Sequence, residues 1–157
     1  ILTGLFQARE RIWIATPYFI PDEAITRGLV LAARRGLDVT LLVPERSNHL
    51  TADIAGGSYL RQIERAGARV RPFRGGMMHA KVTLIDHDLA ILGSANLDMR
   101  SLFLDYEIAV FIYTRPEIER FEEWFKRLLR HCAERLEEPG TVRALAEDLG
   151  RLLAPLM

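Results

Sequence analysis

A histidine and a lysine two positions apart are the side chains of this sequence best suited to chemistry. His79 and Lys81 lie within the run 78–86, whose apolar and β-branched residues are typical of a buried strand. Because side chains alternate between the two faces of a strand, His79 and Lys81 would share one face and Asp86 would lie on the other. The sequence therefore predicts that His79 and Lys81 act together on one ligand, while Asp86 anchors the scaffold from behind.

An imidazole beside an ammonium group suits reactions at phosphorus. Histidine can attack phosphorus or transfer a proton near neutral pH, and lysine places a compact positive charge beside phosphate oxygens. A His-x-Lys pair alone is equally consistent with a structural histidine beside a lysine whose charged end reaches solvent. A larger set of polar residues and one glycine within eighteen positions is more specific, and it consists of His79, Lys81, Asp86, Gly93, Ser94 and Asn96.

The spacing of this set resembles the signature of the phospholipase D superfamily, His-x-Lys-x4-Asp-x6-Gly-Ser-x-Asn, at every position. The longer segments GSANLDMRS (93–101) and TPYFIPDEA (16–24) are similar in particular to bacterial cardiolipin synthases. The resemblance begins at Ile12 and extends nearly to the end of the chain. It implies that residues 1–157 form a single phospholipase D-like domain, the C-terminal half of a two-motif enzyme.

The resemblance also implies a reaction, a phosphatidyl transfer that needs no cofactor or metal. Such an enzyme joins two phosphatidylglycerols through a phosphohistidine intermediate and releases glycerol, with Lys81, Ser94 and Asn96 at the phosphate. The superfamily builds its site from two His-x-Lys motifs, and this sequence contains one. The chain would then supply half of the site, completed by a missing N-terminal half or by a homodimer mate. In the two-motif arrangement His79 would be the general acid and base.

Glu107 is the acidic member of the otherwise apolar run 106–113. A buried carboxylate needs a partner, and a catalytic histidine needs a group that orients it. The superfamily places a histidine-orienting acid at this position, so the resemblance assigns that role to Glu107. An exposed glutamate at a strand end is the alternative. The residues expected to carry catalysis are therefore His79, Lys81, Asp86 and Glu107.

The composition narrows the choice of partners. The 21 basic and 21 acidic residues give a formal net charge of zero, whereas nucleic-acid-binding proteins usually carry a basic excess. No nucleic acid is expected, although a local basic patch can be hidden in a neutral total. The single cysteine, Cys132, cannot form a disulfide within the chain.

No apolar run approaches the roughly eighteen residues of a membrane-spanning helix. The full-length protein is expected to associate with the bacterial cell membrane through its phospholipid substrate, and this fragment is expected to be soluble. Two alternatives stay open. One is a single-motif phosphodiesterase or nuclease that works as a homodimer, and the other is an inactive isolated domain.

Hydrophobic periodicity predicts an α/β fold. Strand and helix patterns alternate in the first half, which favours right-handed crossovers and parallel pairing. The expected strands cover 11–15, 38–43, 69–73, 78–86, 89–92 and 106–113, and helices are expected over 22–36, over 52–66, from Pro116 and from Thr141. The result is a mixed, mainly parallel sheet flanked by helices on both faces.

Two features have uses that the pattern leaves open. Tyr18 and Phe19 follow the first strand and would either face a lipid or cap the core, whereas His49 would lie in a solvated loop. The last helix has an apolar stripe that would either lie on a membrane surface or, more in keeping with its mixed charges, pack against another half of the molecule. The residues of this stripe are Val142, Leu145, Leu149 and Leu152.

Overall fold

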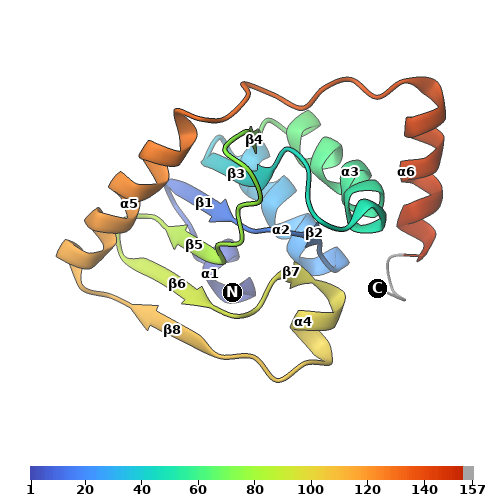
Figure 1. The fold of residues 1–157 in the computed structure, drawn as a ribbon. Coiled ribbons are helices and arrows are strands. Elements are labelled where there is room, and N and C mark those ends of the chain that lie inside the picture. The colour runs from blue at the N-terminus through green and yellow to red at the C-terminus, as the bar shows by residue number, and fades with distance from the viewer. Residues whose placement is uncertain (154–157) are drawn as a thin grey trace.

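A six-stranded mixed sheet organises the chain (Figure 1). The computed structural model describes residues 1–153, apart from the side chains of residues 142, 148 and 151–153. The strands follow the spatial order β4-β3-β1-β5-β6-β8. In chain order they are β1 (Arg11–Ala15), β3 (Asp38–Pro44), β4 (Arg69–Phe73), β5 (Val82–Ile85), β6 (Leu89–Gly93) and β8 (Ala109–Ile112).

The predicted α/β class and mixed sheet are confirmed, but the parallel part is smaller than predicted. Within this sheet only β4, β3 and β1 pair in parallel, and β5, β6 and β8 are added to β1 in antiparallel order. Parallel neighbours need a long crossover, usually a helix. The connection from β4 to β5 (74–81) has no helix, and β5 therefore enters the sheet antiparallel to β1.

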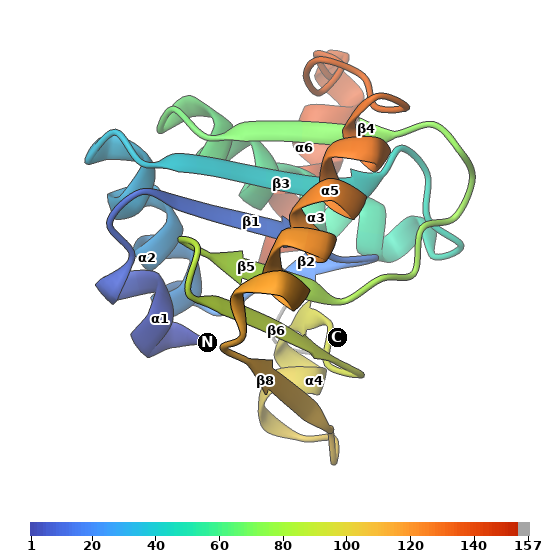
Figure 2. The same cartoon turned by 90° about the vertical axis from the view of Figure 1, so that its left-hand side faces the viewer.

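Helices cover both faces of the sheet (Figures 1 and 2). One face carries α1 (Leu2–Gln7), α2 (Glu23–Arg34) and α3 (Leu50–Arg65), and the other carries α5 (Arg115–Leu129). The last helix, α6 (Thr141–Leu153), packs on α3. Alternate residues of β1 supply the two cores. Ile12 and Ile14 pack on the α1–α3 side, whereas Trp13 and Ala15 pack on the α5 side, where Trp13 stacks on Phe125.

The strand that follows His79 and Lys81 is shorter than predicted. It begins at Val82 rather than at residue 78, so both side chains lie in an irregular segment just before the strand. Val82 pairs with Ala15, which is the last residue of β1. Residues before Val82 therefore have no residue of β1 to pair with. The strand predicted over 106–113 is likewise reduced to β8.

Two short strands and a short helix connect the remaining parts. They are β2 (Phe19–Ile20), β7 (Leu97–Asp98) and α4 (Met99–Phe103), and β2 pairs with β7 in parallel. A glycine pair in α3 allows its neighbours to approach closely. A Cβ at Gly56 would lie 2.8 Å from the carbonyl oxygen of Phe19, and one at Gly57 would lie 2.5 Å from the carboxyl carbon of Glu147 in α6. The pair therefore makes room for β2 and α6.

The apolar stripe of α6 does not pack on this chain where its side chains are described. Leu145 is 63% exposed and Leu149 is 55% exposed, whereas Glu147 is 1% exposed and forms ion pairs with Arg61 and Arg143. Val142 and Leu152 lie outside the described side chains. Whether the stripe meets a membrane or another part of the molecule stays open. Among the described residues, no helix combines the length and apolar character needed to cross a membrane.

Candidate functional site

His79 and Lys81 meet at the carboxyl end of β1. The Nζ atom of Lys81 lies 2.8 Å from Nδ1 of His79 and 3.1 Å from the His79 carbonyl oxygen. An ammonium group has donors only, so a charged Lys81 that donates to Nδ1 would favour the His79 tautomer with its proton on Nε2. The two side chains are therefore in contact, through a bend of the irregular segment rather than through the predicted strand alternation.

The environment of Lys81 acts on its charge in two directions. Partial burial lowers the pKa of Lys81 below the ordinary lysine value, and the carboxylates of Glu107 and Asp98 oppose that shift. Two acids therefore lie close enough to act on the Lys81 charge, and of these only Glu107 was a predicted site residue.

Gly93 and Ser94 join Lys81 to the strand that carries Glu107. The Gly93 N–H donates to the Lys81 carbonyl oxygen at 3.3 Å, and the Ser94 N–H donates to the Ile108 carbonyl oxygen at 3.0 Å. A Cβ at Gly93 would lie 2.2 Å from the Ile108 carbonyl oxygen. Glycine is therefore required for the chain to approach this closely, which explains its place in the motif.

Replacing Gly93 by alanine is expected to lower the free energy of unfolding by about 2 kcal/mol, because the added methyl group pushes Ile108 away from β6. The midpoint of urea denaturation measures the change. Gly140→Ala is the matched control, since nothing lies within 4 Å of a Cβ at Gly140. Equal midpoints for the two variants would show that the contact at Gly93 is not tight.

Glu107 is held by Ser94. The Ser94 hydroxyl donates to the Glu107 carboxylate, and the Ile108 N–H donates to the Ser94 oxygen at 3.0 Å. Among the hydrogen bonds of the described residues, none joins Glu107 to His79. The carboxylate is exposed and acts electrostatically on Lys81. Its role in orienting a histidine stays a prediction.

Asn96 faces inward, toward α4. Its Nδ2 atom donates to the Ser101 hydroxyl at 3.3 Å, and its Oδ1 atom is buried without a protein partner among the described residues. Asp98 caps the same helix by accepting from the Ser101 N–H at 2.7 Å. Asn96 thus shapes the segment after Ser94, and phosphate binding by its amide stays a prediction.

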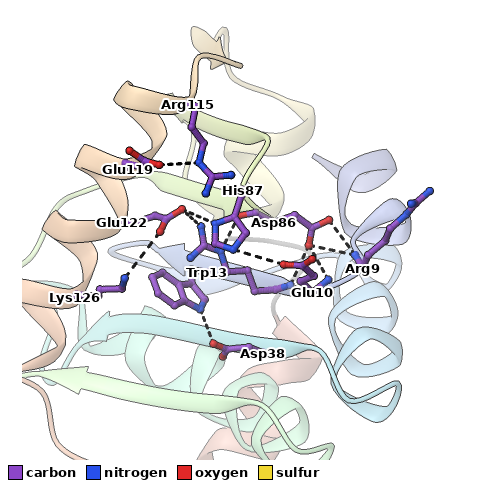
Figure 3. A network of polar contacts seen from close by, with 11 residues as sticks. Arg9, Glu10, Trp13, Asp38, Asp86, His87, Arg115, Glu119, Glu122 and Lys126 are labelled. Carbon is purple, nitrogen blue, oxygen red and sulfur yellow. Dashed lines mark hydrogen bonds and ion pairs between the residues drawn. The ribbon is translucent and has the colours of Figure 1, made fainter.

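Asp86 follows the end of β5 that is opposite to His79, and Figure 3 shows it beside Arg9 and Glu10. Its carboxylate accepts from the backbone N–H groups of Arg9, Glu10 and Arg11 at 2.8–3.2 Å, and Arg11 Nε donates to its carbonyl oxygen at 2.7 Å. Burial raises the pKa of Asp86, but these hydrogen bonds and the Arg11 charge outweigh it and leave the pKa below its ordinary value. Asp86 therefore connects the C-terminal end of β5 to the start of β1.

Tyr18 lies beside His79, a contact that was not predicted from the sequence. The two rings meet nearly at right angles, 82°, with centroids 6.2 Å apart, and the Tyr18 hydroxyl donates to Asn48 Oδ1 at 2.5 Å. The antiparallel pairing of β1 with β5 brings Tyr18 here, because Ala15 is opposite Val82. The parallel pairing expected from the sequence would not have indicated this neighbour. Asp98 was also missed as a group near Lys81.

Comparisons with known proteins agree with this geometry. The family model described as "Cardiolipin synthase, PLD-like domain" matches residues 1–129. Cardiolipin synthase 2 of Bacillus anthracis is 40% identical over 154 residues, which are 96% of this chain and 30% of that protein. The chain spans about a third of the length of the curated relatives that it matches.

Two solved structures share the fold. A phospholipase D family member, Nuc from Salmonella typhimurium, has a TM-score of 0.75 and 25% identity, covering 87% of this chain and 88% of that one. Phosphatidylserine synthase of Haemophilus influenzae has a TM-score of 0.75 and 19% identity, covering 99% of this chain and 44% of that one. On the strength of the family model and the sequence relatives, the chain belongs to the family of cardiolipin synthase phospholipase D-like domains.

Proposed function

We propose that this chain is the C-terminal half of a cardiolipin-synthase-type phosphatidyltransferase, whose complete form works on phosphatidylglycerol at a membrane surface. The contact between His79 and Lys81 is the observation that carries the proposal. It combines a proton-transferring or nucleophilic imidazole with a cation in one exposed position. Family membership and the names of the relatives support this choice of substrate.

The reaction divides into two displacements at phosphorus. A histidine of the companion motif attacks phosphatidylglycerol, forming a nitrogen–phosphorus bond as the bond to glycerol breaks, and His79, which enters this step as an imidazolium, gives one ring proton to the departing glycerol. A hydroxyl group of the second phosphatidylglycerol then loses its proton to His79 and attacks phosphorus. The nitrogen–phosphorus bond breaks and both imidazoles return to their starting forms. Lys81 neutralises the charge that develops on the phosphate oxygens.

An apolar surface beside the site supports the need for a companion half. β8 is the last strand of the sheet, and its residues are exposed on both faces, with Val110 on one and Phe111 on the other. Figure 2 shows β8 and α4 extending beyond the helices that cover the rest of the sheet. A long apolar edge invites pairing or cover by another chain. Glu107 lies two residues before this strand, so a partner that covers β8 would also approach Glu107 and Lys81, on which the Glu107 charge acts.

The proposal is tested by measuring solution mass and lipid turnover together. Light scattering gives the mass of the chain, and radiolabelled phosphatidylglycerol vesicles report labelled cardiolipin and released glycerol. Turnover is expected only from a dimer, or from a monomer supplied with a companion His-x-Lys half. Release of phosphatidic acid without cardiolipin, or cleavage of plasmid DNA in its place, would favour the phosphodiesterase or nuclease alternative.

Replacing Lys81 by alanine is expected to lower kcat of the assembled enzyme by about a hundredfold, because the transition state loses a charge at phosphate. Steady-state kinetics on phosphatidylglycerol measure the change. Lys126→Ala is the matched control, since Lys126 is the only other lysine of the sequence and lies on α5 near Trp13. Equal rates for both variants would exclude Lys81 from the phosphate site.

A further inference from the structure

We propose that Tyr18, fixed by Asn48, is a positioning residue that holds the His79 imidazole in a single orientation. The inference rests on the proposed function only for the statement that His79 is the reactive group. Its geometry and its main test concern this chain alone. Neither Tyr18 nor Asn48 belongs to the His-x-Lys or Gly-Ser-x-Asn segments.

His79 has few neighbours that could hold it. It is exposed and lies in a segment without regular secondary structure. Among the described residues its side chain hydrogen-bonds only to Lys81, whose long flexible side chain is a weak guide for a ring. The one aromatic ring against the imidazole is that of Tyr18, at right angles, an arrangement that aromatic pairs favour.

Tyr18, by contrast, is fixed along its whole length. The Thr16 hydroxyl donates to its carbonyl oxygen at 2.8 Å, and the next residues, Phe19 and Ile20, form β2, which pairs with β7. At the other end, the phenol hydroxyl donates to Asn48 Oδ1 at 2.5 Å. A ring held at its backbone and at its hydroxyl has one orientation, so the ring packed against it is restricted too.

Asn48 in turn belongs to a structured loop. The Ser47 N–H donates to the Asp53 carboxylate at 3.1 Å, and the His49 N–H donates to the Ser47 hydroxyl oxygen at 3.0 Å. The His49 ring packs on Tyr18 with centroids 5.5 Å apart. The first turn of α3, where Asp53 lies, is thereby connected through the loop and Tyr18 to His79. His49 is exposed in this loop, as predicted, and its ring also supports the Tyr18 ring from another side.

The main test observes the tautomer of His79 in the isolated chain. Two-bond proton–nitrogen spectra of 15N-histidine-labelled protein near pH 8.5, where imidazoles are neutral, resolve the four histidines. His79 is expected to be mostly the Nε2–H tautomer, because Lys81 donates to Nδ1. In Tyr18→Leu the excess of this tautomer is expected to fall by at least about half, toward the mixture of a freely rotating ring.

Variants that change only the Tyr18–Asn48 hydrogen bond distinguish a positioning role of Tyr18 from a simple loss of packing against His79. Tyr18→Phe and Asn48→Leu each remove the same bond, so each should give a similar, smaller change and the double variant no more. Asn48→Asp keeps an acceptor for the Tyr18 hydroxyl and should restore the parent spectrum. His87 and His131 report whether the fold is intact, and if Tyr18→Leu fails to fold, the two milder variants decide.

An unchanged His79 tautomer in folded Tyr18→Leu would overturn the proposal, as would additive effects of Tyr18→Phe and Asn48→Leu. In the assembled enzyme, Tyr18→Leu should lower kcat about tenfold with KM little changed, because a misplaced reactive group loses rate rather than binding. The spectra do not depend on turnover. A failed lipid assay would therefore contradict the proposed function and leave the positioning of His79 to be judged from the spectra.

Discussion

Replacing His79 by alanine is expected to lower kcat of the assembled enzyme by at least about a thousandfold, since the variant can neither attack phosphorus nor transfer a proton. The melting temperature should stay that of the parent, because the His79 side chain is exposed and its hydrogen bonds reach only Lys81. Single-turnover formation of cardiolipin, measured beside thermal unfolding, checks both parts.

The matched control for His79 is His131, which lies in the turn after α5 and packs on Phe73. His131→Ala removes the same side chain far from Lys81 and should keep the parent rate. Full activity of His79→Ala would remove His79 from the chemistry altogether. A slow variant with a lowered melting temperature would instead assign His79 a structural role.

Replacing Asp86 by alanine is expected to reduce the free energy of unfolding by about 3 kcal/mol, the largest stability change that we expect in this chain. Three backbone N–H groups, of Arg9, Glu10 and Arg11, lose a charged acceptor. Asp86 also has a φ of 48°, which aspartate and asparagine tolerate better than alanine. Urea denaturation measures the loss, and the specific activity of the folded fraction should be retained.

Asp86→Asn separates charge from shape. The amide keeps one acceptor and tolerates the same backbone conformation, so about half of the loss is expected. A stable but inactive Asp86→Ala would contradict the anchoring role and would place Asp86 in the chemistry. Asp86 directly follows β5 and His79 lies three residues before it, so the whole strand separates the two side chains and speaks against a shared role in the chemistry.

Acid should weaken the same part of the molecule. The pKa of Asp86 is lowered, so its contribution to stability is fully present above the ordinary aspartate pKa of about 3.9 and is lost as the pH falls through the lowered value. Glu122 adds to this: burial raises its pKa, but hydrogen bonds from Arg11 and His87 outweigh that and leave it lowered. Below about pH 4 the unfolding free energy of the parent should decline more steeply than that of Asp86→Asn.

The sequence by itself predicted the candidate reactive residues and the main elements. Residue types and spacing indicated His79 and Lys81 as candidates, because the chemistry that a side chain can perform depends on its type and on the reactive groups near it in the sequence. Hydrophobic periodicity predicted the bounds of β1, β3, β4, α2 and α3 to within a few residues. It could do so because each of these elements buries apolar side chains in the core. Strand alternation does not account for the separation of Asp86 from His79, because His79 lies outside β5; Asp86 lies at the other end of the strand, where it accepts hydrogen bonds from the backbone of Arg9–Arg11.

Only the tertiary structure decided which residues surround His79. Tyr18 is 61 positions from His79 in the chain and lies beside it because β1 and β5 run antiparallel, and Asn48, which follows β3, bonds Tyr18 because β3 pairs with β1. The direction in which a strand enters a sheet depends on the segment that connects it and on its neighbouring strands. The hydrophobic periodicity of the strand itself does not predict this direction. The same reason explains why Glu107 meets Ser94 across β6 and β8. Side-chain types specify what can react, and strand pairing specifies what holds it in place.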